Sequence, residues 1–299
     1  MKKILSILLS VLLTAAVFAG CSNNEKKENA ADVVSDTYIT VDSHYAFADE
    51  SVKRAYEKLC TAVINGEDTV SFNTQMLDDI TQLFYTSFPL NSLVSDIHLL
   101  QDRTGVSITY KNDTDIHKQK VAEFYNKVNE ILDACSLDSA GKDRFVFNVY
   151  TYITANFQID SSVVSVYDVI MNCRGTAASV NSAFEYLVLC GSGEASHVVN
   201  TTGAAAMLSL VKFNSNFYYF DPASEIIANS GSALKYFAMN DKRVSSYIFG
   251  GLNYTDQTEV GAVDDETYDN LDSSDSYTVT ENGISVNYGN NDTFMLDIN

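Results

Sequence analysis

Apolar residues in the first half of the chain recur at the spacing of one face of a helix. This periodicity constrains the fold more than any other feature. It predicts a helix from Asp49 to Ile64 and a second one that begins after the cap residue Asn73. Two more are predicted from Asp115 to Cys135 and from near Ser139 to Phe157. We expect the aromatic residues on these stripes to form the core.

The second half of the chain adds strand-like alternation. A fifth helix is predicted from Cys173 to Cys190, and a hairpin turn at Asn214-Ser215. Helices followed by strands predict an α+β fold, in which N-terminal helices precede a cysteine-bearing helix packed on a small antiparallel sheet. The predicted strands are Val106 to Tyr110, Glu194 to Val199, Met207 to Phe213, Asn216 to Phe220, Tyr277 to Val279 and Ile284 to Tyr288.

The first residues have the layout of an export signal. Lys2 and Lys3 precede an apolar run from Ile4 to Phe18, which is too short for a comfortable transmembrane helix. The ending Ala19-Gly20-Cys21 resembles a lipobox, in which the cysteine thiol receives a lipid before cleavage. We therefore expect Cys21 to be the lipidation site of a protein anchored in the cell membrane and facing the extracellular side, with a plain secreted form as the alternative.

These patterns divide the chain into five predicted segments. An acidic, Ser-rich stretch from Asp264 to Asp275 lacks apolar periodicity and is predicted to be a solvated loop. Its carboxylates do not follow the spacing of a calcium loop, so no metal site is expected. The segments are a signal peptide (1–20), a lipid anchor and flexible tether (21–45), a helical N-terminal region (46–160), a core (161–250), and an acidic loop with C-terminal strands (251–299).

The charge balance excludes two classes of partner. The chain holds 19 basic and 39 acidic residues, a formal net charge of −20. A surface of this sign repels phosphate backbones and anionic headgroups. We expect no nucleic-acid partner, and contact with the membrane through the N-terminal lipid only.

Four cysteines follow Cys21, and export permits their oxidation. They are Cys60, Cys135, Cys173 and Cys190, and their pairing cannot be deduced from the sequence. The last two would lie at opposite ends of the fifth predicted helix, roughly 25 Å apart, which is too far for a disulfide. Two lone histidines, His98 and His117, are predicted to lie at the surface.

The segment from Tyr167 to Glu225 carries the most specific motif. It opens a predicted helix with Cys173-Arg174-Gly175-Thr176-Ala177 and ends a strand pair on Phe220-Asp221-Pro222. A cysteine in the first turn of a helix has its thiolate stabilised by the unsatisfied amides and the macrodipole, which lowers the thiol pKa. Gly175 is expected to permit close approach of the backbone.

In this order the pieces resemble the transglutaminase-like superfamily, whose fold is papain-like. The resemblance runs from about Asn156 to Asp241, and it is specific around Cys173 and Asp221. It implies acyl transfer through a thioester, with Cys173 as the nucleophile and Asp221 as the carboxylate that orients a histidine. It implies no cofactor.

The resemblance breaks at the catalytic histidine. Counting back from Asp221 places that position on Ala206, and the neighbouring tryptophan position on Leu208. Thr176 also replaces the tyrosine that usually follows the glycine. His197 on the preceding strand is a possible displaced base, because it should run beside Ala206 if the strands are antiparallel.

The sequence leaves three functions open. We favour a non-catalytic module that binds a peptide, a glycan, a protein or a cell-wall component. The alternative is an active transglutaminase or peptidase that uses Cys173 and Asp221 with His197 as base. A spacer protein of the cell envelope, which needs no site, is the third.

Overall fold

The computed structural model describes residues 39–40, 45, 48–135, 141–191, 193–200, 207–228, 233–246, 252–254, 262–280, 283–289, 292–296 and 298. At 197–200 and 252–254 it describes the backbone alone. The predicted signal peptide, Cys21, most of the tether and Ala206 lie outside the described residues. No helix within the described ranges combines the length and the apolar character that crossing a membrane requires.

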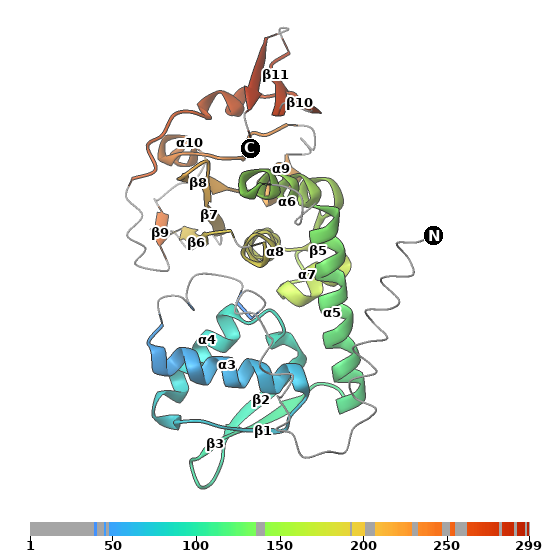
Figure 1. Ribbon diagram of the computed structural model, residues 1–299, viewed down its shortest axis with the longest axis vertical. Coiled ribbons are helices and arrows are strands. Elements are labelled where there is room, and N and C mark those ends of the chain that lie inside the picture. The colour runs from blue at the N-terminus through green and yellow to red at the C-terminus, as the bar shows by residue number, and fades with distance from the viewer. Residues whose placement is uncertain are drawn as a thin grey trace. The chain divides into compact units, whose positions relative to one another are not determined.

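The four predicted N-terminal helices are confirmed (Figure 1). Gly66 ends the first with a φ of 68°, and the side chain of Asn73 accepts a hydrogen bond from the Gln75 amide at 3.1 Å, as a cap residue should. The turn after Asn73 is a short 3₁₀ helix. The bounds are α3 Glu50–Asn65, η3 Thr74–Met76, α4 Leu77–Ser87, α5 Thr114–Ala134 and α6 Lys142–Asn156.

A three-stranded antiparallel sheet lies between α3 and α5 in the sequence. Its order is β1-β3-β2, and only its central strand was predicted. The strand β2 escaped prediction because most of its side chains are exposed on both faces, which leaves no alternation. The bounds are β1 Thr69–Ser71, η4 Asn91–Leu93, β2 Val94–Leu99 and β3 Gly105–Tyr110.

The prediction that the fifth helix begins at Cys173 is wrong. Cys173 ends a separate helix, with a φ of 52° in the left-handed region, and the long helix starts at Ala177. Thr176 is the cause, because its hydroxyl accepts a hydrogen bond from the Ser179 amide at 3.2 Å and caps the helix there. The bounds are β4 Gln158–Ile159, α7 Val166–Asn172, β5 Arg174–Gly175 and α8 Ala177–Cys190.

The predicted packing of a helix on a small antiparallel sheet is observed with α8. The sheet has the order β8-β7-β6-β9, and α8 contacts β7, β6, α6, α7 and α9 (Figure 1). Asn214 and Ser215 form the predicted hairpin turn, both with positive φ. The strand bounds are β6 Ala195–Asn200, β7 Met207–Phe213, β8 Asn216–Phe220 and β9 Leu252–Tyr254.

The acidic stretch is not the solvated loop that was predicted. It contains a 3₁₀ helix and buries Tyr268 and Leu271, and Val263 is buried directly before it. These three apolar residues hold the stretch against the core, although they follow no regular period. The remaining elements are α9 Pro222–Ile227, α10 Asp241–Ser245, η5 Asp269–Ser273, β10 Ser276–Thr280, β11 Gly283–Asn287 and β12 Thr293–Leu296.

The molecule therefore mixes helices with small antiparallel sheets, as the α+β class requires. The described residues belong to one compact unit. The five segment boundaries stay a prediction.

Candidate functional site

Cys173 lies on the α5 side of α7, not at the start of α8. Its carbonyl accepts a hydrogen bond from the Gln158 amide at 3.0 Å, and Lys127 and Glu130 of α5 act on its thiol electrostatically. Partial burial raises the pKa of the Cys173 thiol, Lys127 lowers it and Glu130 raises it further. The lowered pKa predicted from a helix terminus is therefore wrong, because the terminus begins four residues later.

The first turn of α8 carries no thiol. It begins with Ala177 and Ala178, followed by Ser179. The Ser179 hydroxyl donates to the Val163 carbonyl at 3.1 Å and lies 2.8 Å from the Thr176 hydroxyl. The Ser179 amide of this turn bonds the Thr176 hydroxyl, and no thiol lies in the turn for the helix terminus to stabilise.

Gly175 permits the close approach that the sequence predicts. A Cβ atom at this position would lie 2.4 Å from Val169 of α7 and 2.7 Å from the Ser179 hydroxyl. Any side chain would push α7 away from the start of α8. The glycine therefore positions the first turn of α8.

Asp221 is buried between α8 and α9 and caps α9. Its Oδ1 accepts from the Ser224 amide at 3.0 Å and from the Asn181 side chain at 2.9 Å, and its Oδ2 accepts from the Ser224 hydroxyl at 2.6 Å. Asn181 also donates to the Met207 carbonyl at 2.5 Å. Asn181 thus links Asp221 to Met207 at the start of β7, and the bonds of Asp221 serve the fold. Its role as an orienting carboxylate stays a prediction.

A buried polar chain continues from Asn181 into the core. The Ser209 hydroxyl of β7 lies 3.2 Å from the Asn181 carbonyl and 3.4 Å from the carboxylate of Glu185. Glu185 is fully buried. The sequence held a signal for this pair, because Asn181 and Glu185 stand four apart on a helix whose other buried residues are mostly apolar.

Glu225 is a second fully buried carboxylate that the sequence did not single out. It accepts from the Tyr150 hydroxyl at 2.8 Å and from the Tyr236 amide at 2.9 Å. Both partners come from distant parts of the chain. These bonds join α6, α9 and the segment that follows α9, so the carboxylate has a structural role.

The displaced base His197 is placed only through its backbone. It lies on β6 and pairs in register with Ser209 of β7. Its side chain and Ala206 lie outside the described atoms, so its predicted pairing with Cys173 stays a prediction.

A cleft of about 530 Å³ opens at the start of α8. Its walls are the end of α4, η4, residues 164–166, the first turns of α8 and Met207 of β7. No charged side chain lines it among the described residues, and neither does Cys173. Tyr85 and Val164 on its walls are 47% and 73% exposed. This volume lies in the range of small-molecule sites.

The described residues hold no group of three or more His, Cys, Asp or Glu side chains that could bind a metal ion. Cys60, Cys135, Cys173 and Cys190 are free thiols. Burial raises the pKa of Cys135 and of Cys190 to about 12. His98 is exposed as predicted, whereas His117 is fully buried, because its ring packs on Tyr110 and bonds the Val63 carbonyl.

No family model matches the chain, and neither does any curated protein. The chain is similar to a solved structure from Cytophaga hutchinsonii that is described as a "putative cysteine protease", with 13% identity and a TM-score of 0.23. The match covers 38% of this chain and 42% of that one, less than half of either. A similarity of this size does not establish a shared fold.

Proposed function

We propose that the chain is a surface-anchored binding protein on a transglutaminase-like scaffold, and that its cleft at the start of α8 holds a ligand without acyl-transfer chemistry. One observation carries the proposal. Ala177 and Ala178 occupy the first turn of α8, whereas Cys173 lies outside the cleft at the end of α7.

The chemistry of the thiol supports this proposal. Acyl transfer needs a thiolate at neutral pH, and the pKa of Cys173 is raised by burial. The position of the superfamily's histidine is Ala206. General acid–base assistance is worth roughly 10²–10⁴-fold in rate, so its loss leaves little activity.

The enzyme alternative requires Cys173 and His197 to act as a pair. The described charges that act on the Cys173 thiol come from Lys127 and Glu130. The His197 side chain lies outside the described atoms, so the assay below has to decide this alternative. The spacer alternative needs no cleft, yet a cleft is present.

The experiment is an assay of the full chain for amine incorporation into casein and for peptide hydrolysis. We expect the wild type and Cys173→Ala to give the same background rate, with an active transglutaminase and papain as positive controls. Activity that disappears in both Cys173→Ala and His197→Ala would instead establish the enzyme.

Surface anchoring is the second part of the proposal, and it rests on the lipobox-like ending at Cys21. In a bacterial host, the wild type should be found in the membrane fraction with its signal removed. Cys21→Ser should remain an unprocessed precursor. Identical processing of both forms would contradict lipidation and leave the binding proposal intact.

A further inference from the structure

We propose that the cleft at the start of α8 takes an uncharged carbohydrate. This inference rests on the proposed binding function and names the chemical class of its ligand. It follows from the lining of the cleft, from the polar groups that the fold leaves available there, and from the absence of a strand edge among the described residues that line it.

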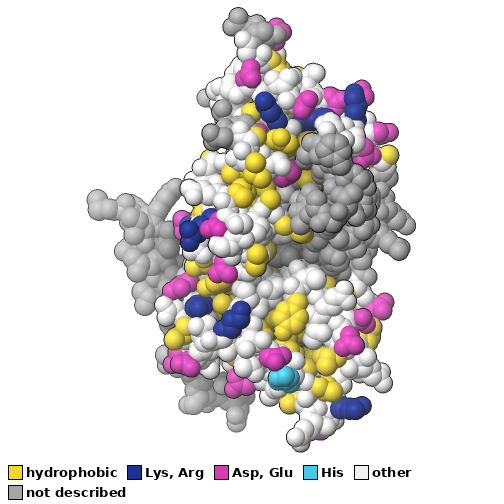
Figure 2. Space-filling model, turned by 180° about the vertical axis from the view of Figure 1, so that it is seen from behind, with side chains coloured by type: hydrophobic (Ala, Val, Ile, Leu, Met, Phe, Trp, Pro, Cys, Tyr) yellow, Lys and Arg dark blue, Asp and Glu magenta, His cyan; other side chains and the backbone are white. Residues whose placement is uncertain are grey.

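The cleft is neutral within a highly charged chain. Charged residues make up 19% of the sequence, and charged side chains of both signs are spread over the face seen in Figure 2. None lines the cleft among the described residues. A phosphate, carboxylate or ammonium group would lose its hydration there and find no partner of opposite charge. The ligand that fits this lining is uncharged.

The available polar groups are hydroxyls and an amide. Ser182 makes no hydrogen bond with the described residues, and the Ser92 hydroxyl is buried without a partner among them. Asn91 uses its amide nitrogen on the Tyr85 carbonyl at 2.7 Å, which leaves its side-chain oxygen as an acceptor. Hydroxyl and amide groups both donate and accept, as the hydroxyls of a sugar do.

Tyr85 supplies a flat surface beside these groups. Tyr85 is 47% exposed and lines one wall of the cleft. Tyrosine presents an apolar face and a polar tip, which is why it is frequent at binding surfaces. A sugar ring offers a matching apolar C–H face and polar edges.

An extended peptide fits these walls less well. Peptides that add to a sheet need a free strand edge, and the described walls are helices, irregular segments and Met207. Met207 pairs with Val199 of β6, and its carbonyl accepts from Asn181. Its backbone is therefore already engaged.

The test is calorimetric titration of the full chain with neutral chitotetraose and with its fully deacetylated, cationic counterpart. We expect the neutral oligosaccharide to bind. Tyr85→Ala should weaken binding by about tenfold or more, and Tyr85→Phe, which keeps the ring, by less than about threefold. Ile116→Ala is the matched control, because Ile116 is also 47% exposed but lies on α5, away from the cleft. It should leave binding unchanged.

The outcomes separate this inference from the proposed function. Binding that favours the cationic oligomer, or that is unaffected by Tyr85→Ala, would overturn the carbohydrate assignment. The assignment would also be overturned if a neutral peptide library bound and the sugar did not, and if peptide binding depended on Tyr85. In that case the proposed binding function would still hold. A different result, catalysis that depends on Cys173, would contradict the proposed function itself.

Discussion

Two nearby charges of opposite sign, those of Lys127 and Glu130, act on the Cys173 thiol. The reactivity of the thiol should therefore depend on both. Lys127 and Glu130 are 2.9 Å apart and form an ion pair on α5. Lys127→Met removes the charge that stabilises the thiolate, so the thiol pKa should rise and iodoacetamide labelling at pH 8 should slow by about threefold. Glu130→Gln should speed it by a similar factor. Peptide mass spectrometry assigns the label to Cys173.

A cysteine introduced at the start of α8 is the informative comparison. Ala177→Cys places a thiol in the first helical turn, where unsatisfied amides stabilise a thiolate. Its labelling should persist to lower pH than that of Cys173 in the same chain. Equal pH profiles for the two thiols would show that the helix terminus has no influence here.

His117 links stability to pH. Its Nε2 donates to the Val63 carbonyl, its Nδ1 has no partner in the described structure, and burial lowers its pKa, so the folded state favours the neutral ring. The unfolded state binds the proton more readily, because its histidine pKa is about 6.5. The stabilisation is therefore present above about pH 6.5 and is lost as the pH falls towards the folded value.

The measurement is the free energy of unfolding at pH 7.5 and pH 5.5. The wild type should lose stability between these values, and His117→Gln should lose less of it, although it is less stable at both by about 1–3 kcal/mol. His98→Gln is the control, since that ring is exposed and pairs with the exposed Asp96. An unchanged pH dependence in His117→Gln would contradict the assignment.

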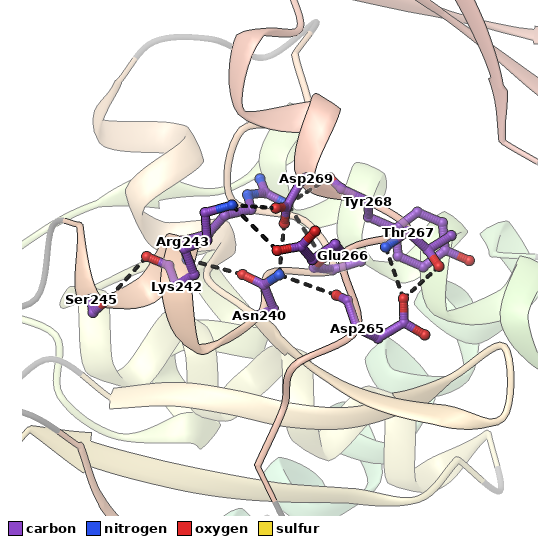
Figure 3. A network of polar contacts seen from close by, with 10 residues as sticks. Asn240, Lys242, Arg243, Ser245, Asp265, Glu266, Thr267, Tyr268 and Asp269 are labelled. Carbon is purple, nitrogen blue, oxygen red and sulfur yellow. Dashed lines mark hydrogen bonds and ion pairs between the residues drawn. The ribbon is translucent and has the colours of Figure 1, made fainter.

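At the scale of elements, one buried arginine holds the acidic segment in place (Figure 3). Arg243 of α10 donates to the carbonyls of Phe237, Ala238 and Tyr268 at 3.0–3.3 Å and to that of Lys235 at 2.6 Å. Its neighbour Lys242 is 72% exposed and pairs with Glu266 and Asp269. From a buried position, Arg243 thus joins residues 235–238 to Tyr268 of the acidic segment, whereas Lys242 contacts that segment from an exposed position.

We expect Arg243→Met to cost about 3–5 kcal/mol, because it leaves buried carbonyls unpaired. Lys242→Met should cost less than about 1 kcal/mol, as exposed ion pairs do. Limited proteolysis should cut residues 262–275 early in the first variant and not in the second. Early cleavage in the wild type would show that the segment is loosely held.

The elements that the sequence predicts correctly are those whose apolar pattern repeats over many residues. The stripe of α5 extends over 21 residues, and its core face can be identified from spacing alone. Strands of two or three residues, such as β4 and β9, have no period to detect. The predicted start of α8 was wrong because the family motif places the helix start at Cys173. In the structure the Thr176 hydroxyl caps the helix, which therefore begins at Ala177.

At the scale of the whole molecule, the candidate site depends on contacts that a local pattern cannot contain. Asn181 and Asp221 are 40 residues apart, and the pair is visible only once α8, β7 and α9 are packed. The sequence singled out Asp221, which is buried as the cap of α9, but its role and that of position 206 stay predictions. It could not predict that Cys173 lies outside the cleft, because the backbone conformation at one residue decides this.

The net charge of −20 acts on the whole molecule. Acidic side chains repel one another in the compact state, and salt screens this repulsion over about 30 Å at 10 mM and about 8 Å at 150 mM. We expect the free energy of unfolding to rise between these NaCl concentrations, because the exposed ion pairs that salt weakens contribute little.

Asp133→Lys removes one negative charge, adds a positive one, and places it at the end of α5, where a helix favours a cation. This variant should be more stable than the wild type at 10 mM NaCl, and the difference should shrink at 150 mM. A wild type that loses stability on adding salt would show that local ion pairs outweigh the net charge.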